Sequence, residues 1–203
     1  MSAEFTSADL AKAAMAIAAG VKGATDELNR QDGLLGDGDL GITVSAGWQA
    51  VADVAPQFPA DIGKAFLAAA KAFQQVSSSS FGTMVASALM AAARHTNGRT
   101  AVPWPEVPEL VAAARDAMMS RGKGALGDKT VMDSLEAVRV ALVGKDHAYM
   151  RLAAADAAEA ALAEFRSRPN KLGRARMFAD RSIGIDDPGM LAFARIVASM
   201  PDE

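Results

Sequence analysis

The sequence predicts an all-α protein, a barrel or bundle of about eight antiparallel helices, and three observations lead to this fold class. Apolar residues recur at helical spacing; the first stripe, spaced 4-3-4-3-4, is Leu10, Ala14, Ile17, Val21, Ala24 and Leu28. Apolar residues make up 51% of the chain but aromatic residues only 5%. Alanine dominates the apolar residues, and a core of such small side chains favours closely packed helices. No segment alternates convincingly between apolar and polar residues, as a half-buried strand would.

The helices can be placed in order along the chain. The first carries the stripe from Leu10 to Leu28, and Ser7 is its predicted N-cap. A connection at 95–105 contains Asn, Gly and two prolines. The last helix has Pro188 in its first turn, where the missing N–H is not needed. The helices after the first are predicted at about 42–55, 61–76, 81–94, 106–120, 131–142, 148–166 and 188–200.

Four polar, glycine-rich stretches fall between the predicted helices. None is long enough to act as a linker, so residues 1–203 are predicted to form a single domain. In an up-and-down bundle alternate connections gather at one end. We therefore expect one site shared by several loops, and the stretches concerned are 31–41, 76–83, 121–130 and 170–189.

Composition excludes several classes of partner. The net charge is −3, which gives no electrostatic reason to expect binding to nucleic acid or to an anionic membrane. The chain has no cysteine, so disulfides, thiolate zinc sites and a cysteine nucleophile are excluded. No basic segment followed by an apolar run marks a signal peptide, and no uncharged run is long enough to span a membrane. We expect a cytoplasmic protein.

The stretch GDGDLG at 36–41 matches the G-x-G-x-x-G pattern of dinucleotide-binding turns. That turn must follow a strand inside a strand–helix–strand unit, whereas a long amphipathic helix precedes these glycines. An EF-hand loop that started at Asp37 would place Gly41 and Trp48 at positions that need oxygen ligands. We reject both interpretations.

The stretch GKGALGDKT at 122–130 is close to a phosphate-binding P-loop, but Asp128 is inserted before Lys129 and no strand precedes it. We reject the P-loop. The stretch could still wrap a phosphate or a base with backbone groups, helped by a helix N-terminus near Asp128. Two roles remain open for Lys129: an ion pair with Asp128 or Asp133, or a contact with phosphate.

Asp32, Asp37 and Asp39 lie within eight residues, and glycines between them permit turns that bring three carboxylates around one point. Carboxylates so close would repel one another, and a hard divalent cation removes that repulsion. Mg²⁺ prefers carboxylate oxygens together with substrate phosphates, and three carboxylates could bridge two ions. The alternative is an ordinary solvated turn in which each aspartate caps a helix or a turn.

Four separated segments bear on this choice. The stretch DGLLGDGDLGITVSAGW resembles the metal-binding loop of the nucleotide-binding L subunit of dihydroxyacetone kinase. The stretches SSSSFGT, RGKGALGDKTVMDSLE and GRARMFADRSIGIDDPG resemble three further segments of that family, in the same order. The resemblance covers essentially the whole chain. Its most specific part is RGK-x-x-x-GDKT combined with RSIG-x-x-DPG.

The resemblance implies a barrel of eight antiparallel helices with ADP or ATP held at one end. It also implies that Asp32, Asp37 and Asp39 bind two Mg²⁺ ions that bridge the diphosphate. It favours a phosphate contact for Arg181 over a surface pair with Asp180 or Asp186. The positions that match nucleotide contacts, or lie next to one, are Leu40, Gly41, Ile42, Thr43, Ser77, Ser78, Ser80, Gly122, Val131, Arg181, Asp187, Pro188 and Gly189.

The sequence departs from the family pattern in three places. Leu40 stands where the family has a histidine, and it has no polar group to offer a nucleotide. A serine run that follows Val76 replaces the usual glycine-rich run. The segment before RSIG reads RARMFAD instead of the usual Tyr-Leu-Gly-Glu. These changes indicate a divergent branch whose sugar could also differ.

The function implied is that of a Mg²⁺-dependent phosphotransferase subunit, which acts on dihydroxyacetone or a related short ketose such as erythrulose. In the family the ketose is held by a histidine of a separate K subunit, so the active enzyme is expected to be a complex. The source of the phosphoryl group is left open between ATP and a phosphotransferase-system protein. Whether the chain forms a homodimer is also left open. The alternative function is an ADP-loaded binding module that docks on a transcription regulator or another partner.

Overall fold

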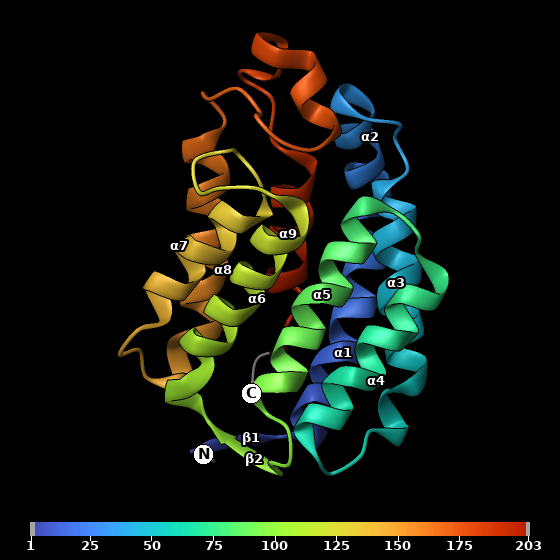
Figure 1. Cartoon of the computed structure of the whole chain (residues 1–203), viewed down its shortest axis with the longest axis vertical. Helices are drawn as coiled ribbons and strands as arrows, with labels where there is room; N and C mark the ends of the chain where they lie inside the picture. Colours follow the sequence, from blue (N-terminus) through green and yellow to red (C-terminus); the bar gives the residue numbers. More distant parts are fainter. Residues whose placement is uncertain (1–2, 202–203) are drawn as a thin grey trace.

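The computed structural model describes residues 3–201, and helices make up most of it (Figure 1). Three short 3₁₀ segments connect the α-helices: η1 (Ala55–Gln57), η2 (Trp104–Glu106) and η3 (Arg174–Ser182). The α-helices in the described residues are α1 (Ser7–Gly23), α2 (Thr25–Leu35), α3 (Leu40–Val54), α4 (Ile62–Val76), α5 (Ser80–His95), α6 (Val107–Gly122), α7 (Val131–Leu142), α8 (His147–Phe165) and α9 (Pro188–Ala198).

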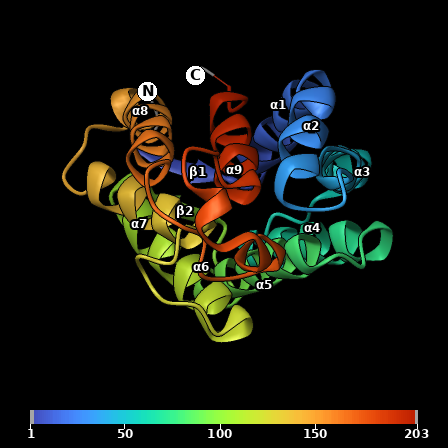
Figure 2. The same ribbon diagram turned by 90° about the horizontal axis from the view of Figure 1, so that it is seen from above.

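Eight of these helices form a closed ring. Helix α1 packs on α3, each helix from α3 to α8 packs on the next, and α9 closes the ring against α1 (Figure 2). The interior is filled mainly by aliphatic side chains and alanines around Phe73, which is fully buried. The predicted helical barrel is therefore confirmed. Helix α2 is an addition to the ring and packs on α3 and α9.

The N-terminal stripe extends over two helices and not one. The helix is interrupted at Ala24 (φ −92°, ψ 0°), although Val21 and Leu28 on either side are both fully buried. Ser7 is also not the N-cap. Thr6 takes that position and forms a capping box with Asp9, whose carboxylate accepts the Thr6 N–H at 2.8 Å.

Two short strands, β1 (Glu4–Thr6) and β2 (Ala101–Pro103), were not predicted. They pair antiparallel, with Phe5 opposite Val102, and both of these side chains are buried. Three residues are too few to show alternation in a sequence. This two-stranded sheet lies at the end of the barrel that is lowest in Figure 1.

The four predicted glycine-rich connections gather at the opposite end (Figure 1). They are the turn between α2 and α3, the serine run between α4 and α5, the loop between α6 and α7, and the long segment between α8 and α9 that contains η3. This arrangement follows from the up-and-down connectivity, as the sequence predicted. None of the described helices combines the length and the apolar composition that a membrane-crossing segment needs.

Candidate metal and nucleotide site

The three aspartates of the first motif lie together at the loop end of the barrel. Asp32 is on the last turns of α2, while Asp37 and Asp39 lie in the turn that leads into α3. One carboxylate oxygen from each lies within 4.8 Å of the others. Asp37 and Asp39 are exposed, and Asp32 is half-buried. The structure thus places three carboxylates where they could share ions that are open to a ligand from solvent.

The glycines of this turn allow the close approach of its carboxylates. Gly38 has a φ of 80°, a conformation that L side chains rarely adopt. The Oδ2 atom of Asp32 accepts hydrogen bonds from the N–H groups of Gly38 at 2.9 Å and Asp39 at 3.1 Å. A Cβ atom at Gly36 would lie 2.4 Å from Oδ1 of Asp32. The G-x-G pattern therefore shapes a carboxylate cluster in this protein.

The charges of the cluster are only partly balanced within the chain. Burial, followed by the charges of Asp37 and Asp32, raises the pKa of Asp39 above its ordinary value. A hydrogen-bonded ion pair with Arg174 of η3 lowers the pKa of Asp37. One guanidinium thus faces three carboxylates. The donor set of three oxygen ligands at short range fits Mg²⁺.

Two side chains of α2 fix the elements next to this turn. The Oδ1 atom of Asn29 accepts hydrogen bonds from the N–H groups of Gly41 at 2.8 Å and Ile42 at 3.3 Å, which fixes the first turn of α3. Gln31 donates to the carbonyl oxygen of Asp186 at 2.8 Å and so ties α2 to the segment before α9. Neither residue belongs to a recognisable sequence pattern, and we did not predict either contact.

The residues at the start of α3 that are predicted to contact the nucleotide differ in their solvent exposure. Leu40 and Gly41 are buried, Thr43 is half-buried, and the side chain of Ile42 is 60% exposed. Leu40 belongs to the hydrophobic core, so its side chain points inward. Any contact of Leu40 or Gly41 with a nucleotide would come from the backbone.

The serine run begins helix α5. Ser79 is the N-cap, and its Oγ accepts the N–H of Gly82 at 3.0 Å. Ser77 is buried beside it, with the two hydroxyl oxygens 3.2 Å apart. Ser78 and Ser80 are exposed at the loop end. These two hydroxyls are therefore the ones free to face a ligand from solvent.

The remaining predicted positions lie at the same end of the barrel. Gly122 ends α6, and Val131 begins α7 with its side chain buried. Pro188 and Gly189 form the first turn of α9. The guanidinium of Arg181 lies over the ring of Phe178, 5.8 Å from its centroid. The structure thus brings all the predicted segments together, with Arg181 held in η3.

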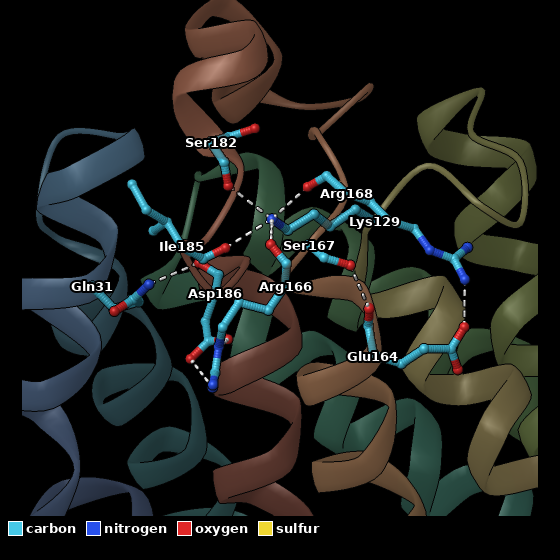
Figure 3. Close-up of polar contacts among 9 residues, drawn as sticks. All are labelled: Gln31, Lys129, Glu164, Arg166, Ser167, Arg168, Ser182, Ile185 and Asp186. Atoms are coloured by element: carbon cyan, nitrogen blue, oxygen red, sulfur yellow. Dashed lines mark hydrogen bonds and ion pairs between the residues drawn. The ribbon is translucent and has the colours of Figure 1, made fainter.

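Lys129 adopts neither of the two roles left open by the sequence. Its side chain is fully buried, and its Nζ donates to four backbone carbonyl oxygens of the segment between α8 and α9 (Figure 3). These carbonyls belong to Arg166 at 3.3 Å, Arg168 at 2.8 Å, Ser182 at 2.9 Å and Ile185 at 2.7 Å. The ammonium thus anchors both ends of the segment that carries η3. Burial lowers the pKa of Lys129.

Asp187 is buried next to this network and caps α9. Its Oδ1 accepts the N–H of Met190 at 2.8 Å, and its Oδ2 accepts the side-chain amide of Asn170 at 2.7 Å. The same amide group donates to the carbonyl oxygen of Lys129 at 2.9 Å. Burial raises the pKa of Asp187 to about 6, against the opposing effect of these hydrogen bonds and of the Lys129 charge. The position predicted to meet the nucleotide is therefore a buried helix cap.

We expect Asp187 to make stability depend on pH. Its folded-state pKa lies above the unfolded value near 4, so the stability it contributes is present at pH 4 and is lost as pH rises through 6. The free energy of unfolding of Asp187→Asn, taken relative to that of wild type, should therefore rise by about 2 kcal/mol from pH 4 to pH 7. Denaturant unfolding at both pH values, with the exposed Asp180→Asn as control, measures this difference. A difference independent of pH would contradict it.

Comparison with known proteins shows the family of this chain. Residues 34–202 match the DAK2 domain family. The chain belongs to the DAK2 domain family. It is a DhaL-like member, because it is also 27% identical to the ADP-binding subunit DhaL of the PEP-dependent dihydroxyacetone kinase 1 of Listeria innocua, over 85% of this chain and 84% of that subunit.

Other relatives of this DAK2 domain are larger kinases. It is 34% identical to a D-erythrulose kinase of Mycolicibacterium smegmatis over 95% of this chain, and 31% identical to an L-erythrulose kinase of Pectobacterium atrosepticum over 91%. The chain spans about a third of the length of these two kinases, 35% and 34% respectively.

Solved structures show the same fold. The native dihydroxyacetone kinase of C. freundii superposes with a TM-score of 0.74 at 22% identity, over 94% of this chain and 33% of that one. The same kinase in complex with AMP-PNP and Mg²⁺ gives a TM-score of 0.72 over 93% of this chain. The DAK2 domain is thus an all-α helical barrel of the kind found in dihydroxyacetone kinases.

Proposed function

We propose that this DAK2 domain is the Mg²⁺- and nucleotide-binding part of a dihydroxyacetone-type kinase. It would phosphorylate dihydroxyacetone or a related short ketose such as erythrulose, together with a K-type part that binds the ketose. The observation that carries this proposal is the cluster of Asp32, Asp37 and Asp39, whose oxygens lie within 4.8 Å of one another at the loop end. Bound Mg²⁺ would neutralise the oxygens of the transferred phosphoryl group.

The residues around the cluster suit a phosphate ligand. Asn29 holds the first turn of α3, and Ser79 caps α5, so two helix N-termini are fixed at this end. Helix N-termini favour anions through their dipole, and here the N–H groups of Gly41, Ile42 and Gly82 themselves donate to Asn29 and Ser79. The exposed hydroxyls of Ser78 and Ser80 add hydrogen-bond donors at the same end. These groups position a nucleotide and contribute no covalent chemistry.

The ketose site is expected elsewhere. Each of the two histidines lies at the far end of a helix from the aspartates: His95 ends α5, and His147 begins α8. Neither can hold a ketose beside the aspartate cluster. The K-type part would be another subunit, as the DhaL relatives suggest, or another region of a longer chain, as the length of the erythrulose kinases suggests.

The test is reconstitution of phosphoryl transfer. The DAK2 domain alone, with ATP and Mg²⁺, should not phosphorylate dihydroxyacetone, D-erythrulose or L-erythrulose. Addition of the cognate K-type part should restore transfer to one of them, and Asp37→Ala should abolish it. Asp53→Ala removes an exposed carboxylate of α3 far from the cluster and should have no effect.

Two other results of this assay would lead to different conclusions about the division of labour and about the phosphoryl donor. Turnover by the isolated domain would contradict the division of labour. Transfer that requires a phosphorylated phosphotransferase-system protein in place of ATP would assign the chain to the PEP-dependent branch, in which ADP stays bound.

A further inference from the structure

Asp39 differs from the other aspartates that stand at helix N-caps in the described residues. It precedes α3, and an aspartate at this position ordinarily accepts the N–H of the second or third helical residue. Its side chain makes no such bond, and its ψ angle is 4°. The other three each cap the helix that follows them, with ψ angles of 112°, 138° and 128°: Asp61, Asp146 and Asp187. Asp39 thus leaves the cap of its own helix to another group.

Asn29 of α2 supplies that cap. Helix α3 begins at Leu40, so Gly41 and Ile42 are its second and third residues. The Oδ1 atom of Asn29 accepts both of their N–H groups, at 2.8 and 3.3 Å. The approach is close, because a Cβ atom at Gly41 would lie 2.8 Å from that oxygen and 2.1 Å from the carbonyl oxygen of Thr25. An amide of the neighbouring helix therefore takes the two N–H groups that the N-cap aspartate would otherwise accept.

The carboxylate of Asp39 belongs to the aspartate cluster instead. One of its oxygens lies within 4.8 Å of oxygens from Asp32 and Asp37. Asp32 follows Asn29 by three residues on α2, so the two side chains leave the same face of that helix. The Oδ2 atom of Asp32 accepts the N–H of Asp39 at 3.1 Å. One face of α2 thus holds the backbone on both sides of residue 40 and leaves the Asp39 carboxylate among the other carboxylates.

We propose that Asn29 is a positioning residue of the metal site, which caps α3 in place of Asp39 and so reserves the Asp39 carboxylate for a divalent cation. The proposal rests on the proposed function. Without the Asn29 amide, Asp39 stands where a carboxylate can accept the freed N–H groups. A bond to them would draw its oxygens out of the cluster. Because the amide is neutral, Asn29 caps the helix without a fourth negative charge beside the three carboxylates.

This exchange predicts that Asn29 and Asp39 can replace each other as the cap of α3. In the metal-free full chain, Asn29→Ala should lower the melting temperature only slightly, because Asp39 takes over the cap. In an Asp39→Ala background the same substitution should lower it by about 2–4 °C, as expected for a helix that loses its cap. A residue that only stabilised the fold would lower the melting temperature equally in both backgrounds.

Metal binding should respond in the opposite way. Binding of Mn²⁺, which accepts the same oxygen ligands, is followed on the metal-stripped full chain by the electron paramagnetic resonance signal of the free ion. Asn29→Ala should weaken it by about tenfold, the loss expected when a group that orients a metal ligand is removed. Asn29→Asp should bind Mn²⁺ at least as tightly as wild type, because a carboxylate accepts the same N–H groups.

A matched control removes a different amide. Gln49 is exposed on α3 and donates to Oδ1 of Asp53 at 2.8 Å, so Gln49→Ala should change neither the Mn²⁺ affinity nor the melting temperature measurably. Wild-type Mn²⁺ affinity in Asn29→Ala would overturn the proposal. Equal melting losses in the two backgrounds, or an Asn29→Asp protein that binds as weakly as Asn29→Ala, would overturn it too. A wild-type chain that binds no Mn²⁺ would instead overturn the proposed function, and this proposal with it.

Discussion

Lys129→Met should melt about 6–20 °C below the wild-type protein. Methionine fills a similar volume, but it leaves the carbonyl oxygens around Nζ without their donor. Those of Arg168 and Ile185 have no other hydrogen-bond donor among the described contacts. Removal of one side of a buried charged network costs about 3–5 kcal/mol. For a domain of this size each kcal/mol corresponds to roughly 2–4 °C.

The chain offers a matched control for this substitution. Lys123 lies in the same loop between α6 and α7 and has the same left-handed backbone, with φ of 54° against 60° for Lys129, but its side chain is exposed. Lys123→Met should melt close to wild type, because it changes charge without loss of a buried contact. If the two variants melted within 2 °C of each other, the buried ammonium would not be an anchor.

A second readout localises the effect. Because Lys129 holds both ends of the segment between α8 and α9, its loss should loosen that segment first (Figure 3). Limited trypsin digestion should then cut faster after the exposed Lys171, Arg174, Arg176 and Arg181 in Lys129→Met than in Lys123→Met. Peptide mass mapping identifies the cleaved bonds.

The helices of the barrel could be predicted from the sequence because their apolar stripes and caps are local. Asp61 and Asp187 cap α4 and α9, and both stand directly before helices whose starts were predicted closely. The break at Ala24 could not be predicted. The stripe continues through it, so the hydrophobic pattern of two helices is the same as that of one.

The site was predictable where its residues are close in the sequence. Asp32, Asp37 and Asp39 meet within one turn, and the glycines between them indicate that turn. Arg174 joins Asp37 across 137 residues, and Lys129 reaches carbonyls 37–56 residues away. No local pattern distinguishes a buried lysine that binds carbonyls from an exposed one that binds phosphate. Only the packing of the loop between α6 and α7 against the segment between α8 and α9 decides between them.

The central claim is that the three aspartates bind a nucleotide through metal. ADP and Mg²⁺ together, at a hundred times the dissociation constant, should stabilise the protein by ~2.7 kcal/mol. This corresponds to a melting-point rise of roughly 5–11 °C. Asp37→Ala and Asp39→Ala should remove most of that rise. Neither substitution should cost much in the ligand-free protein, because each reduces the repulsion in the cluster. Asp53→Ala should respond like wild type.

The most direct measurement is a set of melts on metal-stripped protein with Mg²⁺ alone, ADP alone, both together, and ADP with a chelator. We expect the full rise only when Mg²⁺ and ADP are both present, and we expect it to be lost in Asp37→Ala. A full rise with ADP and the chelator would contradict the claim, because the nucleotide would then bind without a metal bridge. An Asp37→Ala protein that still responds to Mg²⁺ and ADP like wild type would contradict it as well.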